Sequence, residues 1–177
     1  MPQTFNELSK IRKNYSDRFF IYNIGLGHEK TKKNIYYDKN NLQWANFNPE
    51  VNKIDYLKNN KKKIRCSLDT LDNFTKKNKK IFNSKIDLIK IDTEGFELEV
   101  LKGAEKTIKK LKPTYIQIEY NWHHLFKNIN LYYFSKFLKD YDTYKILPFS
   151  KKLLKINSER PEHNYFNYSN IVFIRKK

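Results

Sequence analysis

The sequence contains few of the residues that build disulfide frameworks, metal-binding cysteine motifs and glycine-rich loops. Its 177 residues include one cysteine, Cys66, and four glycines. A single cysteine excludes an intramolecular disulfide and a CxxC metal site, and it favours a reducing compartment. No apolar run approaches the ~20 residues that span a bilayer, and the polar amino terminus lacks the apolar core of a signal peptide. The sequence therefore predicts a soluble protein of the cytoplasm.

Acidic residues are scarce beside basic ones. Lys and Arg total 36 and Asp and Glu total 19, which gives a formal net charge of +17. Such a charge is typical of proteins that bind nucleic acid or anionic surfaces. However, most of the basic residues are Lys, Asn is abundant, and Ala occurs only at positions 45 and 104, a pattern expected from an AT-rich genome. We therefore expect a solvated, lysine-coated surface that binds nucleic acid only nonspecifically.

The hydrophobic pattern predicts alternating helices and strands. Apolar residues at helical spacing predict helices over residues 4–14, 100–111 and 131–141. Runs of β-branched and aromatic residues predict strands over residues 19–24, 64–71, 86–91, 114–120, 144–147 and 171–174. A loop-rich insertion with short strands is expected at residues 28–63, and a lysine-rich connection at residues 73–80. The length suits a single α/β domain over residues 1–177.

The most informative segment covers residues 86–119. An apolar strand at residues 86–91 runs directly into an acidic turn, and a helix and a second strand follow and end on Glu119. The first strand is apolar at nearly every position except Lys90, as expected for a central strand covered on both faces. Strands that deliver carboxylates at their carboxyl ends form the ligand crevice of an open α/β sheet. The segment therefore predicts a functional site at this edge.

The same segment resembles the FkbM-type methyltransferases, which use S-adenosylmethionine. The resemblance is carried by KIDTEGFE at residues 90–97, VLKGA at 100–104 and PTYIQIE at 113–119, and it extends to residues 170–172. It implies a Rossmann-like class I methyltransferase fold with a partial sheet, whose last two strands form an antiparallel pair. It also implies S-adenosylmethionine as the methyl donor and a hydroxyl group of a sugar or other small metabolite as the acceptor.

Two parts of the class I donor site are not recognisable in the sequence. The resemblance implies a glycine-rich turn after the first strand and an acid that holds the ribose, but none of the four glycines lies in such a turn. Residues 2–8 are similar to the segment that follows the ribose-binding acid. The chain is therefore expected to be truncated at the amino end, without the first two strands of the fold, which would leave two strand edges unpaired. A second polypeptide that supplies the missing half is an expected partner.

Gly25, Leu26 and Gly27 are the candidate donor-binding residues that remain. They end the predicted strand at residues 19–24, which the resemblance places near the adenine of the donor. A plain turn explains the two glycines equally well.

The candidate catalytic residues are Asp92, Glu94 and Glu119. The resemblance places the turn from Asp92 to Glu94 at the transferred methyl group, where a carboxylate orients the acceptor or accepts its proton. In the alternative interpretation, Glu94 and Glu97 cap the following helix, whose amino end favours negative charge. Carboxylates also attract Mg²⁺, but the spacing of the acids does not fix an octahedral geometry, so no metal site is expected.

Two adjacent histidines, His123 and His124, follow Glu119 in the sequence. They could line the acceptor pocket or bind a metal. Because adjacent side chains point in different directions, a shared ligand role is disfavoured and ordinary loop histidines are expected. Trp122 beside them is interpreted as either a lid residue or simple packing.

Two other function classes remain open at this point. A nucleic-acid-binding protein would use the tract from Lys53 to Lys85, which has eleven basic and three acidic residues, with Tyr56 and Phe74 available to stack on bases. A non-catalytic scaffolding relic would bind a full-length homologue. Binding of the methyl donor distinguishes the enzyme from both.

Overall fold

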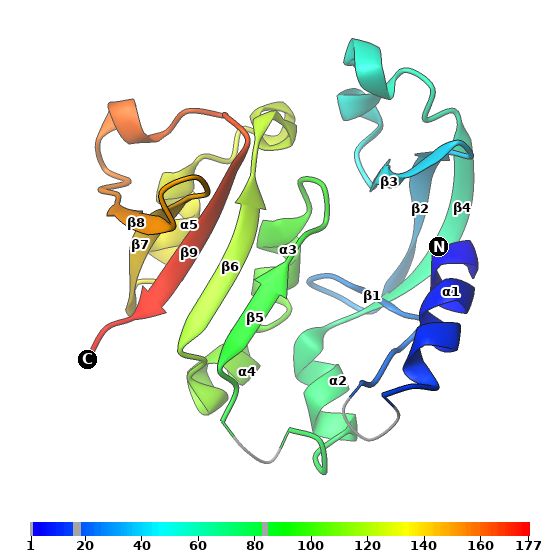
Figure 1. The fold of residues 1–177 in the computed structure, drawn as a ribbon, viewed down its shortest axis with the longest axis horizontal. Helices are drawn as coiled ribbons and strands as arrows, with labels where there is room; N and C mark the ends of the chain where they lie inside the picture. Colours follow the sequence, from blue (N-terminus) through cyan, green and yellow to red (C-terminus); the bar gives the residue numbers. More distant parts are fainter. Residues whose placement is uncertain (1, 16–18, 83–84) are drawn as a thin grey trace.

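The computed structural model describes residues 2–15, 19–82 and 85–177. Two β-sheets and several short helices form a mixed α/β fold (Figure 1). Within the described ranges, no helix is both long and apolar enough to cross a bilayer.

The first sheet has four strands in the order β1-β4-β2-β3. Its strands are β1 (Gly25–Leu26), β2 (Thr31–Asp38), β3 (Asn41–Asn46) and β4 (Lys62–Asp69). The pair β1 and β4 is parallel, whereas β2 is antiparallel to both β3 and β4. The strand predicted over residues 64–71 is confirmed as β4, although it begins and ends two residues earlier.

The prediction of a strand over residues 19–24 is wrong. These residues form no strand, and the side chains of Phe20 and Tyr22 are exposed. Tyr22 packs against a helix instead. Its ring contacts the ring of Phe74 edge-on, with ring centroids 4.6 Å apart. Phe74 lies on α2 (Leu71–Lys77), a helix that occupies most of the expected connection at residues 73–80.

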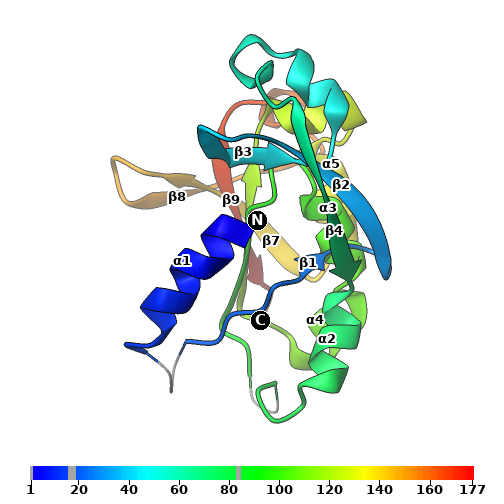
Figure 2. The same ribbon diagram turned by 90° about the vertical axis from the view of Figure 1, so that its right-hand side faces the viewer.

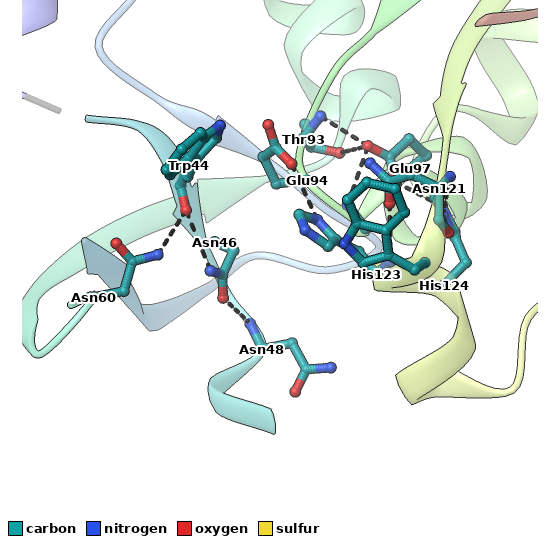
Figure 3. A network of polar contacts seen from close by, with 12 residues as sticks. Trp44, Asn46, Asn48, Asn60, Thr93, Glu94, Glu97, Asn121, His123 and His124 are labelled. Carbon is teal, nitrogen blue, oxygen red and sulfur yellow. Dashed lines mark hydrogen bonds and ion pairs between the residues drawn. The ribbon is translucent and has the colours of Figure 1, made fainter. Parts of the chain in front are cut away.

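Asparagine side chains order the segment at residues 28–63, which holds β2, β3 and the 3₁₀ helices η1 (Pro49–Lys53) and η2 (Asp55–Leu57). The buried Asn46 amide donates to the Asn52 side chain at 3.0 Å and to the Trp44 carbonyl at 3.3 Å. The Asn60 amide donates to the same carbonyl at 2.8 Å. The backbone of Trp44 is therefore held by two amide groups, and its indole takes a fixed place beside Glu94 (Figure 3).

The second sheet has five strands in the order β5-β6-β9-β7-β8. Its strands are β5 (Leu88–Ile91), β6 (Tyr115–Tyr120), β7 (Tyr141–Leu147), β8 (Lys152–Lys155) and β9 (Ser169–Arg175). The pair β5 and β6 is parallel, and β9 runs antiparallel between β6 and β7. The carboxyl ends of β5 and β6 therefore lie at the same edge of the sheet.

The strand β5 lies at the edge of this sheet, so its prediction as a central strand covered on both faces is wrong. Among the described residues β5 pairs with β6 alone, and Leu88 is 52% exposed. The apolar pattern correctly identified a strand, but a pattern does not specify how many neighbours a strand has. An unpaired edge of this kind can accept another strand.

Three helices lie on one face of the second sheet (Figure 2). They are α3 (Glu97–Lys102), α4 (Glu105–Leu111) and α5 (Leu131–Phe137). Their apolar side chains join those of β6 and β9 in the main core, which includes the fully buried Leu101, Ile116, Ile118, Phe134 and Phe173. The remaining helices are α1 (Pro2–Arg12) and the 3₁₀ helices η3 (Trp122–Lys127) and η4 (Pro161–His163).

A break at Gly103 divides the helix that was predicted over residues 100–111. A Cβ atom at Gly103 would lie 1.9 Å from the carbonyl oxygen of Gly27, so only glycine lets the two backbones approach this closely. The new helix α4 is capped from α2, because the Asp72 carboxylate accepts from the backbone N–H groups of Lys106 at 3.0 Å and Thr107 at 2.7 Å. The prediction of one continuous helix is wrong because both causes come from distant segments.

Candidate active site

Asp92 and Glu94 lie in the turn between β5 and α3, and Glu97 is the first residue of α3. Figure 3 shows Glu94 and Glu97. Two residues of the turn have left-handed backbone conformations, with φ of 52° at Glu94 and 89° at Gly95. Oε1 of Glu97 accepts hydrogen bonds from the backbone N–H groups of Thr93 at 2.8 Å and Gly95 at 3.3 Å. It also accepts one from the Thr93 hydroxyl at 3.1 Å. Glu97 therefore holds the turn that presents Asp92 and Glu94.

A buried contact between Glu97 and His124 joins this turn to η3, the segment after β6. His124 Nε2 lies 2.9 Å from Glu97 Oε2, and both side chains are 0% exposed. Burial alone would raise the pKa of Glu97, but His124 and the backbone N–H of Thr93 outweigh it and hold that pKa below its usual value. Because the contact links the segments that follow β5 and β6, it sets the separation of the acids at the two strand ends.

Asp92, Glu94 and Glu119 converge at the carboxyl ends of these strands. Each offers a carboxylate oxygen, and the three oxygens lie within 4.8 Å of one another. Asp92 is half exposed and contacts Lys90 Nζ at 3.0 Å, whereas Glu119 is buried. The structure thus brings together the three residues that the sequence predicted as catalytic.

Glu119 has the most perturbed acidity of the three. Burial raises its pKa, interaction with the Tyr168 hydroxyl lowers it, and the charges of Glu94 and Asp92 raise it further, to about 7. Glu119 also raises the pKa of Tyr168 to about 12. A carboxyl group with a pKa near neutrality can both accept and release a proton under cellular conditions.

The spacing of the three acids is also compatible with a divalent cation, since Mg²⁺ and Ca²⁺ take oxygen ligands. Acidic clusters of this kind are common without an ion, and three carboxylates do not complete an octahedral shell. We therefore derive no step of the chemistry from a metal.

A cavity of about 320 Å³ adjoins the acids. It is lined by residues of both halves of the chain: Trp44, Tyr56, Glu94, Asn121, Trp122, His123 and Tyr168. His123 is buried, and its Nδ1 lies 3.0 Å from Glu94 Oε2. The expectation that His123 and His124 are ordinary loop histidines is therefore wrong, because one lines the cavity and the other contacts Glu97.

Comparison with known families identifies the family of the chain. Residues 2–145 match the family described as the methyltransferase FkbM domain. The chain belongs to this family. No curated protein and no solved structure matches the chain. The match includes the turn after β5 and Glu119, so the acids of the candidate site lie within the FkbM domain.

The described residues of this FkbM domain contain no glycine-rich turn of the kind expected for the methionine end of a methyl donor. Of the described strand-to-helix connections, the turn after β5 alone contains a glycine, Gly95, which follows Glu94. Gly25 and Gly27 pack closely against Leu68, and Gly27 also packs against Phe96. Close packing accounts for both glycines, and a role for Gly25, Leu26 and Gly27 in donor binding stays a prediction.

The sequence did not predict which residues line the cavity in this FkbM domain. Trp44, Tyr56 and Tyr168 come from segments without clear periodicity, and nothing in their local sequence indicates that they line one cavity with Trp122. The sequence offered only a weak indication that Glu97 contacts His124, because both residues follow strands that were predicted to be neighbours. That indication did not specify which of the two histidines would turn inward.

Proposed function

We propose that this chain is a methyltransferase that transfers the methyl group of S-adenosylmethionine to a hydroxyl group of a small molecule such as a sugar. The observation that carries the proposal is the convergence of Asp92, Glu94 and Glu119 at the carboxyl ends of parallel β5 and β6, beside a cavity. Ligands of open α/β sheets bind at this edge. The parallel pair followed by antiparallel β9 and β7 supports a Rossmann-like class I arrangement of this sheet.

Each acid has a role that follows from its surroundings. The donor supplies an activated methyl group, and transfer to a hydroxyl oxygen releases the hydroxyl proton. Glu119 accepts this proton, because its pKa of about 7 leaves a substantial basic fraction at neutral pH. Asp92 and Glu94 orient the acceptor hydroxyl, and most of the rate enhancement comes from this positioning.

The role of Glu119 predicts how the rate depends on pH. Because the basic form must be present, the rate of the wild-type protein should rise from about pH 6 to pH 8, as Glu119 loses its proton. The Glu119→Gln variant should lose this step and be slower at every pH. The measurement is release of S-adenosylhomocysteine with a panel of hydroxylated acceptors, in any assembly that shows transfer. A Glu119→Gln profile with an unchanged pH step would assign the proton transfer to another group.

The donor affinity of the isolated chain provides a second test. We propose that a second polypeptide contributes to donor binding, because the described residues offer no glycine-rich turn for the methionine end. A ligand at a hundredfold its Kd would stabilise the folded state by about 2.7 kcal/mol. We therefore expect a thermal-shift titration of the isolated chain with S-adenosylmethionine to stay flat. A saturable shift would show that the chain binds the donor alone and would remove the reason for a partner.

A further inference from the structure

The cavity beside Glu94 is walled mainly by aromatic rings. Trp44 comes from β3, Tyr56 from η2, Trp122 from η3 and Tyr168 from the residue before β9. The ring centroids of Trp44 and Tyr56 are 5.2 Å apart, with an interplanar angle of 73°. The ring centroids of Tyr56 and Trp122 are 6.0 Å apart, with an interplanar angle of 84°. The indole N–H of Trp122 donates to the Tyr56 hydroxyl, which fixes this corner. Trp44, Tyr56 and Trp122 thus stand nearly perpendicular in succession, and we call the cavity that they line with Tyr168 the box.

The charge of the box is opposite to that of the chain. The chain has a formal net charge of +17, yet among the described residues that line the box there is no Lys or Arg. Glu94 lines it, and Asp92 and Glu119 lie within 4.8 Å of Glu94. Aromatic faces and carboxylates both attract a cation, and a box of perpendicular rings suits an alkylated ammonium group.

Some polar groups of the lining contact one another. The Asn121 side chain accepts from the backbone N–H of His123 at 2.9 Å, and His123 Nδ1 contacts Glu94 at 3.0 Å. His123 Nε2, however, is buried without a hydrogen-bond partner among the described residues, so it remains available to a hydroxyl group of the ligand.

We infer that the box binds the ammonium group of a small hydroxylated amine, either quaternary or protonated. A volume of about 320 Å³ lies at the small end of ligand pockets and holds one such group. That this amine is the methyl acceptor rests on the proposed function, since its hydroxyl would then lie toward Glu119. Binding of the amine itself requires no methyl donor.

The chain offers a direct optical test, because its only two tryptophans, Trp44 and Trp122, both line the box. Choline is the probe, and 3,3-dimethylbutan-1-ol, in which carbon replaces the charged nitrogen, is the matched neutral control. We expect a saturable change in tryptophan fluorescence with choline and at least about tenfold weaker binding of the neutral alcohol. An equal response to both compounds, or no response to choline, would overturn the inference.

Two variants locate the binding. Glu94→Gln should weaken choline binding several-fold and leave binding of the neutral alcohol unchanged. Tyr168→Leu removes one exposed ring and should also weaken choline binding. Glu105→Gln, in an exposed acid of α4, should change neither. Choline binding that is unaffected by both Glu94→Gln and Tyr168→Leu would place the ligand elsewhere. Because no donor is present, a failure here is distinct from a failure of methyl transfer.

Discussion

Replacing Asp92 with asparagine is expected to lower the rate of methyl transfer by about two powers of ten, the loss expected when the acceptor hydroxyl is misplaced by about 1 Å. Asp92 follows β5 directly and reaches both Glu94 and Glu119 with its carboxylate. Its charge also contributes to the raised pKa of Glu119. Asparagine keeps the shape of the side chain and removes the charge, so the loss would report on the chemistry at the strand ends.

The folded state should tolerate this change. The Asp92 side chain is 47% exposed, and its contact with Lys90 lies at the surface, where ion pairs contribute little to stability. We therefore expect the urea midpoint of Asp92→Asn to stay close to that of the wild type. Asp87→Asn is the matched control, because Asp87 lies just before the same strand with an 83% exposed side chain. Turnover of Asp92→Asn equal to that of Asp87→Asn, with the fold intact, would remove Asp92 from the chemistry.

The meeting of Asp92 and Glu119 could be predicted because it depends on local rules. Asp92 follows one apolar strand and Glu119 lies near the end of the next, and a helix between the two strands makes them parallel neighbours. The carboxyl ends of parallel neighbours meet at one edge of the sheet. The sequence therefore placed these acids together without any knowledge of the rest of the chain.

The acceptor side of the site depends on long-range packing and could not be predicted. The backbone of Trp44 is held by asparagine amides of an apparently featureless segment, Tyr56 lies in η2, and Tyr168 precedes the last strand. Likewise, the helix break at Gly103 depends on the close approach of the Gly27 backbone. Hydrophobic periodicity contains no information on such contacts, because it reports the buried face of an element and not its neighbours.

Replacing Glu97 with leucine is expected to have the largest effect on stability. Glu97 is fully buried, and its loss would remove the 2.9 Å contact with His124 and leave the backbone N–H groups of Thr93 and Gly95 without their acceptor. Each buried donor that is left unsatisfied costs about 1–3 kcal/mol. The free energy of unfolding from urea denaturation measures this loss. Glu105→Leu, at an exposed acid of α4, is the control and should change it by less than about 1 kcal/mol.

The effect of Glu97→Leu should depend on pH. The pKa of Glu97 is lower in the folded state than in the unfolded state, where it is about 4.3. The carboxylate therefore stabilises the fold fully above that unfolded pKa. This contribution is lost as the pH falls through the folded-state pKa. The difference in unfolding free energy between the wild type and Glu97→Leu should therefore be full at pH 7 and shrink at acidic pH. A difference that is constant from pH 7 to pH 3 would show that the charge of Glu97 does not contribute.

A double-mutant cycle separates the pair from the cavities that each substitution leaves. Glu97→Leu and His124→Leu each remove one partner of the 2.9 Å contact and leave the other buried without it. The double variant leaves neither group unsatisfied in that contact, so it should be less destabilised than the sum of the single variants. Simple additivity would mean that the two side chains do not interact. Non-additivity would establish that this contact couples the ends of β5 and β6, and with them the spacing of Asp92, Glu94 and Glu119 on which the proposed proton transfer depends.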